Sequence, residues 1–206
     1  MAPTDASRES GEGAGSVLDV RRSRPDVARV VEAAARKGVA IDVSLLGEAA
    51  ASADDAAAAI GVDPGQIVGS IVFVAPRPEG RLAPVVCLVS ARNRVDDGML
   101  AAVMGEPSLR RASAAEVLEL TGFGIVGLPP FGFSRNVRVV MDQDLGAYEW
   151  VWAWAGSPAA MLRVSPGVLR MLANALVTPL AETGWMSAAG SAAMQPRLSF
   201  EAANRS

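Results

Sequence analysis

The stretch "DPGQIVGSIVF", Asp63 to Phe73, joins a turn to an apolar, β-branched run that predicts a buried strand. A second such run, "PVVCLVSA", follows the loop "PRPEGRLA", so the two runs predict a β-hairpin with a long loop. Gly69 interrupts the first run. A glycine inside a strand weakens it and marks a bulge, or a place where a ligand or another backbone comes close.

The chain has 206 residues, half of them apolar, which suits one domain with a sizeable core. We expect a folded domain over residues 21–186, a flexible leader over 1–20 and a flexible tail over 187–206, because both ends are rich in small and polar residues. No apolar run approaches the roughly 20 residues that a membrane span needs. The net charge of -3 gives no global attraction to nucleic acid, although a local arginine patch could still provide one.

Residue types that are missing or rare exclude several chemistries. The chain has no histidine, which rules out histidine general bases, catalytic triads that use histidine and histidine-ligated zinc. The single Cys87 lies in an apolar run and is predicted to be a small buried side chain, and no disulfide can form within the chain. That usage fits a reducing cytoplasm. Lys37 is the only lysine, so a catalytic lysine elsewhere is excluded.

Short helices and short strands alternate irregularly along the chain, which favours an α+β fold over a doubly wound sheet. Helices are predicted at 25–37, 52–61, 98–104, 113–122 and 165–176, and further strands at 39–45, 136–142, 148–156 and 161–164. Ser52 and Gly61 are capping signals for the helix predicted at 52–61. Ser113, Glu116 and Gly122 are capping signals for the helix predicted at 113–122. The segment "FGIVGLPPFGF", 123–133, is predicted to be a rigid surface loop.

Two side-chain patterns admit both a functional and a structural interpretation. Tyr148, Trp150, Trp152 and Trp154 alternate on one predicted strand face; they could stack on bases, but packing toward the core or under a helix is favoured. Asp142 and Asp144 in "MDQDLG" follow a predicted strand and are interpreted as part of a turn, and no metal site is assigned to them.

Four segments in this order, "GVDPGQIVGSIVF", "NRVD", "GLPPFG" and "WAGSP", resemble the YbaK and prolyl-tRNA-synthetase editing-domain family over about residues 27–182. The resemblance implies a single α+β domain built around a curved mixed β-sheet and surrounded by short helices. It also implies an aminoacyl-tRNA deacylase, which hydrolyses the ester at the 3′ end of mischarged tRNA in trans or as a synthetase insertion. The family's substrates are small amino acids such as alanine or cysteine on tRNA(Pro). No cofactor or metal is expected.

The sequence departs from the family pattern at several positions. Gly69 stands where the family usually has a lysine that holds the phosphate of the terminal adenosine. Val126 stands where a glycine is common, Pro129 where a serine or threonine often occurs, and Phe133 where related bacterial sequences often have a histidine. Only an arginine from another segment could replace the missing lysine charge.

The resemblance implies a site made mainly of backbone groups. Backbone N–H groups of the glycine loops at Gly127 and Gly156 would polarise the ester carbonyl, a role that needs no titrating side chain. The alternative is that these glycines only serve tight turns. The implied substrate contacts are Gly69, Ser70, Arg94, Pro130, Phe131, Ser157 and Pro158. Candidate tRNA phosphate contacts, which could equally be arginines on solvated faces, are Arg92, Arg94, Arg110, Arg111, Arg135 and Arg138.

Two functions therefore remain open from the sequence. The first is a trans-editing deacylase of the prolyl-tRNA type. The second is a module that keeps the fold without the reaction and binds tRNA ends, an amino acid analogue or a protein partner, because the lysine is missing. The oligomeric state, the preferred amino acid and the role of the tails do not follow from the sequence.

Overall fold

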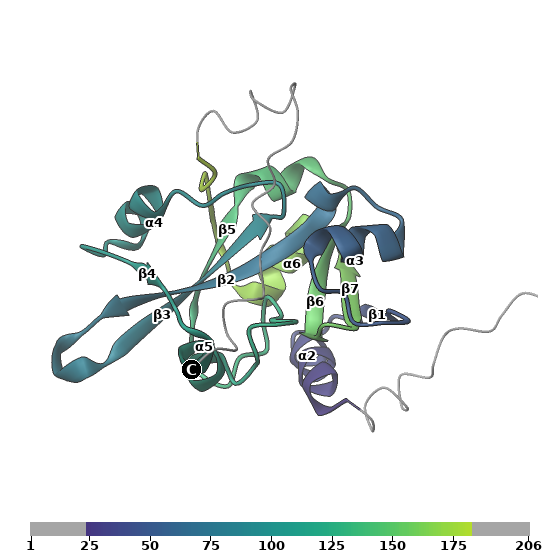
Figure 1. The fold of residues 1–206 in the computed structure, drawn as a ribbon, viewed down its shortest axis with the longest axis horizontal. Helices are drawn as coiled ribbons and strands as arrows, with labels where there is room; N and C mark the ends of the chain where they lie inside the picture. Colours follow the sequence, from purple (N-terminus) through teal and green to yellow (C-terminus); the bar gives the residue numbers. More distant parts are fainter. Residues whose placement is uncertain (1–23, 183–206) are drawn as a thin grey trace, which may run out of the picture.

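A single eight-stranded mixed sheet organises the chain, with helices on both of its faces (Figure 1). The computed structural model describes residues 24–182, so the predicted leader (1–20) and tail (187–206) lie outside the described residues. The order of strands across the sheet is β1-β7-β6-β2-β3-β5-β8, with β4 paired to β2. The predicted α+β domain with a mixed sheet is confirmed. Within residues 24–182 no helix has the length and apolarity to cross a membrane.

The elements have the following bounds: α2 Pro25–Arg36, β1 Asp42–Leu45, α3 Ala53–Ile60, η1 Pro64–Gln66, β2 Ile67–Pro76, η2 Pro78–Gly80, β3 Leu82–Ser90, α4 Asp97–Met104, β4 Arg110–Arg111, α5 Ala114–Thr121, β5 Arg138–Asp142, η3 Gln143–Ala147, β6 Val151–Ser157, β7 Ala160–Val164, α6 Pro166–Ala173 and β8 Leu176–Thr178. The predicted caps are present. The Ser52 hydroxyl accepts from the Asp55 N–H, and Ser113 and Glu116 form a reciprocal capping box.

Strand β2 lies at the centre of the sheet and is paired unevenly on its two edges. Along one edge it pairs with β3 in unbroken antiparallel register from Val68 to Pro76, which confirms the predicted hairpin. Along the other edge it pairs with β6 only at 67–68 and with β4 only at 73–74. Between these two ladders the edge from Gly69 to Ile71 has no strand partner among residues 24–182. We call this opening the fork.

The two faces of the sheet bury different cores. The main core lies on the face covered by α2, α5 and α6 and includes Val68 and Val72 of β2. Two smaller clusters lie on the opposite face, one with Leu100 of α4 and Phe73 of β2, the other with Ala56 and Ala57 of α3. Because side chains alternate along a strand, Ser70 points to the main core and Gly69 to the face that carries α3 and α4.

Several details differ from the expectations. The predicted last helix ends at Ala173 and the strand β8 begins at Leu176, while the two-residue strand β4 was not expected. The segment 123–133 is only half exposed, since residues 127–131 are buried, so its prediction as a surface loop is wrong for that half. Tyr148 and Trp150 precede β6, and Trp152 and Trp154 are partly buried against the cluster beneath α3. The favoured interpretation, packing under a helix, thus holds for Trp152 and Trp154.

Candidate functional site at the sheet fork

The glycine loops around Gly127 and Gly156 lie in direct contact. A Cβ added at Gly127 would lie 2.5 Å from the Ser157 carbonyl carbon and 2.6 Å from the Pro158 nitrogen. Gly127 also has φ +81°, a conformation that L-residues rarely adopt. The two loops, which are about 30 residues apart in the chain, therefore pack backbone to backbone at this point.

Gly156 brings helix α2 against the same loops. Its φ is +89°, and an added Cβ would lie 2.9 Å from the Asp26 carbonyl oxygen and 3.1 Å from the Phe123 ring. Arg24, just before α2, donates from Nη1 to the Ser157 hydroxyl at 3.3 Å, and this hydroxyl also accepts from the Ala159 N–H at 3.3 Å. These contacts hold the Gly156 to Pro158 bend in place. Both glycines thus have structural roles, whatever their backbone groups do in addition.

The loop 123–133 has three buried residues, Gly127, Leu128 and Phe131, whose backbone N–H groups have no hydrogen-bond partner within residues 24–182. Gly127 and Leu128 are buried, yet neither N–H group donates a hydrogen bond to any atom of residues 24–182. Buried backbone N–H groups without a partner are rare in folded proteins, because the desolvation is not compensated. The Gly127 and Leu128 N–H groups are therefore candidate donors in a loop that contacts the Ser157 to Pro158 bend. Nothing in the sequence singled out Leu128, because the burial of its N–H depends on long-range packing.

Ser70 presents a second set of unused polar groups in the fork. Its Oγ atom is buried and has no hydrogen-bond partner among the described residues. Val68 pairs with β6, and the Val72 carbonyl accepts from the Ala112 N–H at 2.9 Å, so alternate backbone groups of β2 point to this edge. The N–H and C=O groups of Ser70 lie between these two and point into the fork.

Gly69 is neither a bulge nor a close backbone crossing. Its ladder with β3 is regular, and a Cβ at this position would meet only the Val89 carbonyl oxygen at 3.7 Å and Val89 Cγ2 at 3.8 Å, which are ordinary contacts. No other atom lies within 4 Å of this Cβ, so we call the surroundings of Gly69 on the face with α3 and α4 the open space above Gly69. The geometry therefore excludes a bulge and a close backbone crossing at Gly69, and the contact of this residue with a ligand stays a prediction.

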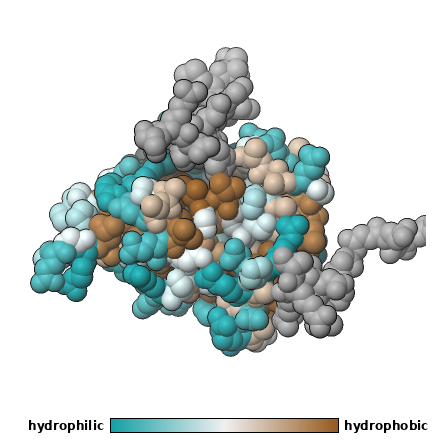
Figure 2. Space-filling view, turned by 60° about the horizontal axis from the view of Figure 1, so that its bottom comes forward, coloured by the Kyte–Doolittle hydropathy of each residue, from teal (hydrophilic) through white to brown (hydrophobic). Residues whose placement is uncertain are grey.

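Pro130 and Phe131 were expected to contact substrate, and both are buried. Phe131 is 4% exposed and belongs to the main core. Phe133 packs edge-to-face against Phe123, with ring centroids 6.5 Å apart. The outer half of the loop is different, since Ile125 and Val126 are 45% and 40% exposed. Figure 2, which brings the lower side of the molecule forward, shows apolar surface among hydrophilic surface on that face. The role of Pro130 and Phe131 as substrate contacts stays a prediction.

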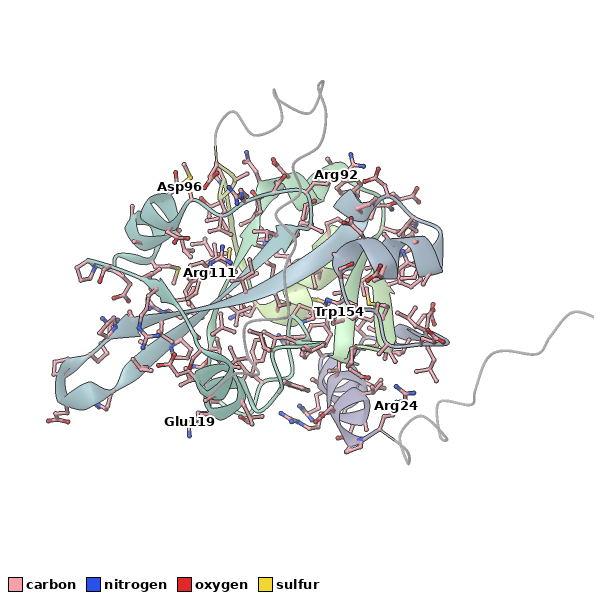
Figure 3. The ribbon with its side chains drawn as sticks, viewed as in Figure 1. Arg24, Arg92, Asp96, Arg111, Glu119 and Trp154 are labelled. Atoms are coloured by element: carbon pink, nitrogen blue, oxygen red, sulfur yellow. The ribbon has the colours of Figure 1, made fainter. Side chains whose placement is uncertain are left out.

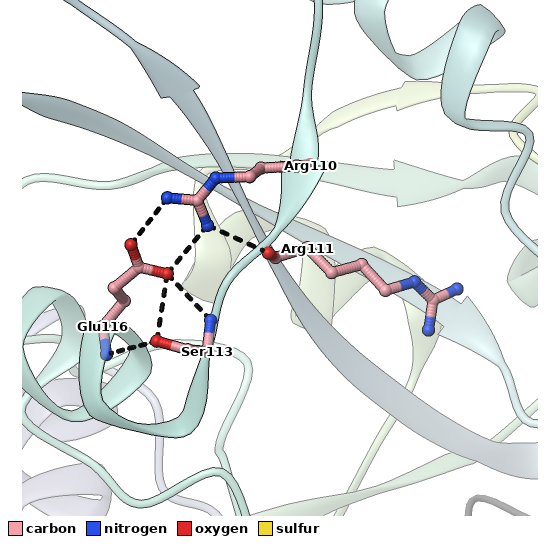
Figure 4. Close-up of polar contacts among 4 residues, drawn as sticks. All are labelled: Arg110, Arg111, Ser113 and Glu116. Atoms are coloured by element: carbon pink, nitrogen blue, oxygen red, sulfur yellow. Dashed lines mark hydrogen bonds and ion pairs between the residues drawn. The ribbon is translucent and has the colours of Figure 1, made fainter.

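Most of the candidate phosphate-binding arginines are held by carboxylates. Arg92 pairs with Asp63, Arg110 with Glu116, Arg135 with Glu119 and Arg138 with Glu106. The Arg110 guanidinium and the Ser113 backbone hydrogen bond lower the pKa of Glu116 to about 2, so this pair keeps both charges at neutral pH. Figure 4 shows Arg110 turned toward Glu116 and the side chain of Arg111 extending away from them.

Arg111 lies on the same sheet face as Gly69, because β4 pairs it with Phe73. Its guanidinium carbon is 5.7 Å from the Phe73 ring centroid, and the side chain has no ion pair within residues 24–182. It lines a polar pocket of about 560 Å³ whose lining also includes Arg94, Val95, Asp96, Asp97 and Glu182. Carboxylates and guanidinium groups mix in this pocket, so it is not a simple anion site. Arg111 is level with Phe73, four residues along β2 from Gly69, and no arginine atom of residues 24–182 lies within 4 Å of a Cβ built at Gly69. Figure 3 shows Arg111 and Trp154 on different sides of β2.

The remaining candidate groups are structural. The Asn93 amide donates to the carboxylates of Asp142 and Asp144, and Asp142 also accepts from the Leu180 N–H. Within residues 24–182 no group of three or more acidic, cysteine or histidine side chains could hold a metal ion. Burial raises the pKa of the Cys87 thiol to about 12, which confirms its prediction as an inert core residue.

Comparisons with known proteins agree with this architecture. Residues 47–172 match the model of the aminoacyl-tRNA editing domain family. The chain is 31% identical over 126 residues to the uncharacterized protein YwhH of Bacillus subtilis, covering 61% of this chain and 76% of that protein. It is 30% identical over 92 residues to the proline–tRNA ligase of Limosilactobacillus fermentum, covering 45% of this chain but only 16% of the ligase.

Solved structures show the same fold. The crystal structure of a candidate trans-editing enzyme for prolyl tRNA synthetase matches with a TM-score of 0.70 and 40% sequence identity, over 77% of this chain and 98% of that one. The matched family segment contains the fork, the loop with the unpaired N–H groups and the Gly156 to Pro158 bend. By sequence and by fold, this chain belongs to the aminoacyl-tRNA editing domain family.

Proposed function

We propose that this protein is an aminoacyl-tRNA deacylase of the prolyl-tRNA trans-editing type, which hydrolyses the ester that joins a wrong amino acid to the 3′ end of tRNA. The observation that carries the proposal is the pair of buried, unpaired N–H groups at Gly127 and Leu128, in a loop that contacts the Ser157 to Pro158 bend. The family membership and the trans-editing neighbour support the same reaction class.

Hydrolysis of this ester does not require an ionisable catalytic side chain. Water adds to the ester carbonyl carbon, negative charge gathers on the carbonyl oxygen, and the bond to the ribose oxygen breaks as that oxygen takes up a proton. Backbone N–H groups aimed at the developing oxyanion lower the barrier, and one such donor contributes about 10²- to 10³-fold to the rate in other hydrolases. The Gly127 and Leu128 N–H groups would fill this role. A chain without histidine can therefore still catalyse the step.

The groups of Ser70 would orient the substrate. Its unpaired hydroxyl and the backbone groups that point into the fork offer donors and acceptors to an aminoacyl-ribose. Arg24 supports the Ser157 to Pro158 bend through its hydrogen bond to the Ser157 hydroxyl. We assign Gly156 a positioning role through its contact with α2, in addition to the donor role that the family resemblance implies.

The direct test is a panel of misacylated tRNAs, with alanine and cysteine on tRNA(Pro) among them. We expect release of at least one amino acid faster than spontaneous hydrolysis, and retention of the correctly charged prolyl ester. A protein that is folded by circular dichroism yet releases no amino acid from any panel member would refute the assignment as a deacylase.

A non-catalytic binding module is the second candidate, and one observation favours it. No arginine or lysine atom of residues 24–182 lies within 4 Å of a Cβ built at Gly69, the position of the family lysine. Gly69→Lys tests whether the missing charge weakens the site, since a Cβ at this position meets only ordinary contacts and its φ is not in the left-handed region. A charge-assisted contact of about 1.5–3 kcal/mol corresponds to roughly 10- to 150-fold in rate.

Gly69→Met is the matched control, because methionine resembles lysine in length and carries no charge. A gain of deacylation in Gly69→Lys alone indicates a site that lost one contact. Unchanged or reduced activity in both variants indicates a pocket adapted to a ligand that uses the open space.

A further inference from the structure

The open space above Gly69 faces a tryptophan across the fork. The parallel ladder pairs Ile67 with Trp152 and Val68 with Ala153, so Gly69 and Trp154 are the next residue of each strand where the pairing ends. Ile67, Trp152 and Trp154 belong to one cluster and so share a sheet face, and Gly69 lies on this face too. Trp154 and Gly69 therefore stand on opposite sides of the fork, on the face that carries α3 and α4.

The indole of Trp154 has unused interaction capacity. Arg163 lies over the rings of Trp150 and Trp152, at 4.9 and 6.0 Å from their centroids, whereas no cation covers the ring of Trp154 in the part of the chain that the structure describes. The Trp154 N–H group likewise donates no hydrogen bond to residues 24–182. The side chain is only partly buried, packed on one side against the cluster beneath α3.

We propose that Trp154 and the open space above Gly69 form a stacking subsite for the 3′-terminal nucleobase of the RNA substrate. The identity of this ligand rests on the proposed function. Proteins that hold unpaired bases stack them on aromatic side chains, and such a site needs a flat wall beside free volume. The indole supplies the wall. Glycine supplies the volume, since any side chain at position 69 would occupy the space that the base enters.

This arrangement also gives the glycine in β2 a reason that the strand itself does not. Neither the φ of Gly69 nor its neighbours exclude a side chain, and a larger residue would stabilise the strand. The backbone N–H and C=O groups of Ser70, which point into the fork, are next to this space along β2, while the Ser70 side chain faces the other side of the sheet. In a purely structural alternative, Trp154 only packs under α3 and the base plays no part in binding.

The test measures binding of a short, uncharged RNA that ends in CCA, compared with the same RNA whose last residue is abasic. Titrations at one fixed salt concentration use wild type, Trp154→Leu, which keeps an apolar side chain, and Trp150→Phe as a matched control outside the fork. Stacking on one aromatic ring corresponds to about 5- to 150-fold in Kd. We expect a loss in that range when wild type meets the abasic RNA, and a similar loss for Trp154→Leu with the intact RNA.

The decisive comparison combines the Trp154→Leu substitution in the protein with the removal of the terminal base from the RNA. In Trp154→Leu, removal of the base should change Kd less than twofold, and Trp150→Phe should behave as wild type. Equal binding of intact and abasic RNA by wild type would overturn the subsite, even if the Trp154 variant does not fold. An undiminished effect of base removal in Trp154→Leu would overturn it as well.

The readout also separates this inference from the proposed function, because uncharged RNA contains no ester. Base-dependent binding through Trp154 without deacylation of any substrate would refute the enzyme and retain the subsite. Deacylation by wild type with equal binding of intact and abasic RNA would retain the enzyme and refute the subsite.

Discussion

Replacing Gly127 by alanine should destabilise the protein and displace the loop that carries the candidate donors. The new Cβ would lie 2.5–2.8 Å from backbone atoms of Ser157 and Pro158, and φ +81° is strained for alanine. The left-handed conformation costs an L-residue about 1–2 kcal/mol. Relief of the overlap by backbone shifts costs about 1–3 kcal/mol more, by analogy with overpacked cores. The sum is about 2–5 kcal/mol.

Gly124→Ala is the matched control within the same loop. A Cβ at Gly124 would meet only the Val126 carbonyl oxygen, at 3.9 Å, and its φ is not positive. We expect this variant to be unchanged or slightly stabilised, because alanine restricts the unfolded chain.

Thermal unfolding and urea titration measure the difference between the two variants. For a domain of this size, 1 kcal/mol shifts Tm by about 2–4 °C, so Gly127→Ala should melt about 4–20 °C below wild type. Deacylation measured well below the lowered Tm should fall more than the folded fraction does, since the loop must move away from Ser157. A Gly127→Ala variant as stable as Gly124→Ala would refute the backbone contact between the two bends.

Three further outcomes test other parts of the structure. Ser70→Ala should leave Tm unchanged or raise it, because the buried hydroxyl has no partner, while deacylation falls about 2- to 12-fold, the value of one neutral hydrogen bond; equal activity would exclude a substrate contact. Arg77 and Arg138 lower the pKa of Glu106 to about 2, below its ordinary value near 4.5, so the stabilisation is complete above pH 4.5 and is lost as the pH falls toward 2. Urea titrations should therefore show the gap between wild type and Glu106→Gln narrowing over that window, and a gap that stays constant with pH would contradict the ion-pair account. A thiol reagent at pH 8 should leave Cys87 unmodified in the native protein and modify it fully in denaturant, whereas rapid native labelling would show that the thiol is accessible.

Local signals predicted the fold where chemistry acts between near neighbours. The Ser52 cap, the Ser113 and Glu116 capping box and the β2–β3 hairpin all depend on residues close in sequence, and each is present. The two-residue strand β4 is too short to produce a periodic pattern, and β8 begins so soon after a helix that the helical pattern includes its first residue, Leu176.

The site was predictable only in part, because its geometry is set by contacts between distant segments. The family motifs pointed to both glycine bends, and the structure places these bends in contact. The fork could not be foreseen, since it depends on how far β6 and β4 each pair with β2. The sequence also gave no sign that Gly69 and Ser70 face opposite sides of the sheet toward different clusters, or that Leu128 would be buried with its N–H unpaired.

The two ladders that bound the fork also fix its aperture. Widening the opening would require breaking backbone hydrogen bonds at 67–68 or at 73–74. A larger ligand therefore cannot enter by displacing β2 alone. A fork of fixed width selects ligands by size, and that size is set when the protein folds rather than by a lid that closes over the bound ligand. Substitutions that lengthen or shorten either ladder by one residue pair would then change the size of ligand that fits the fork. They would do so without removing any polar group of the site.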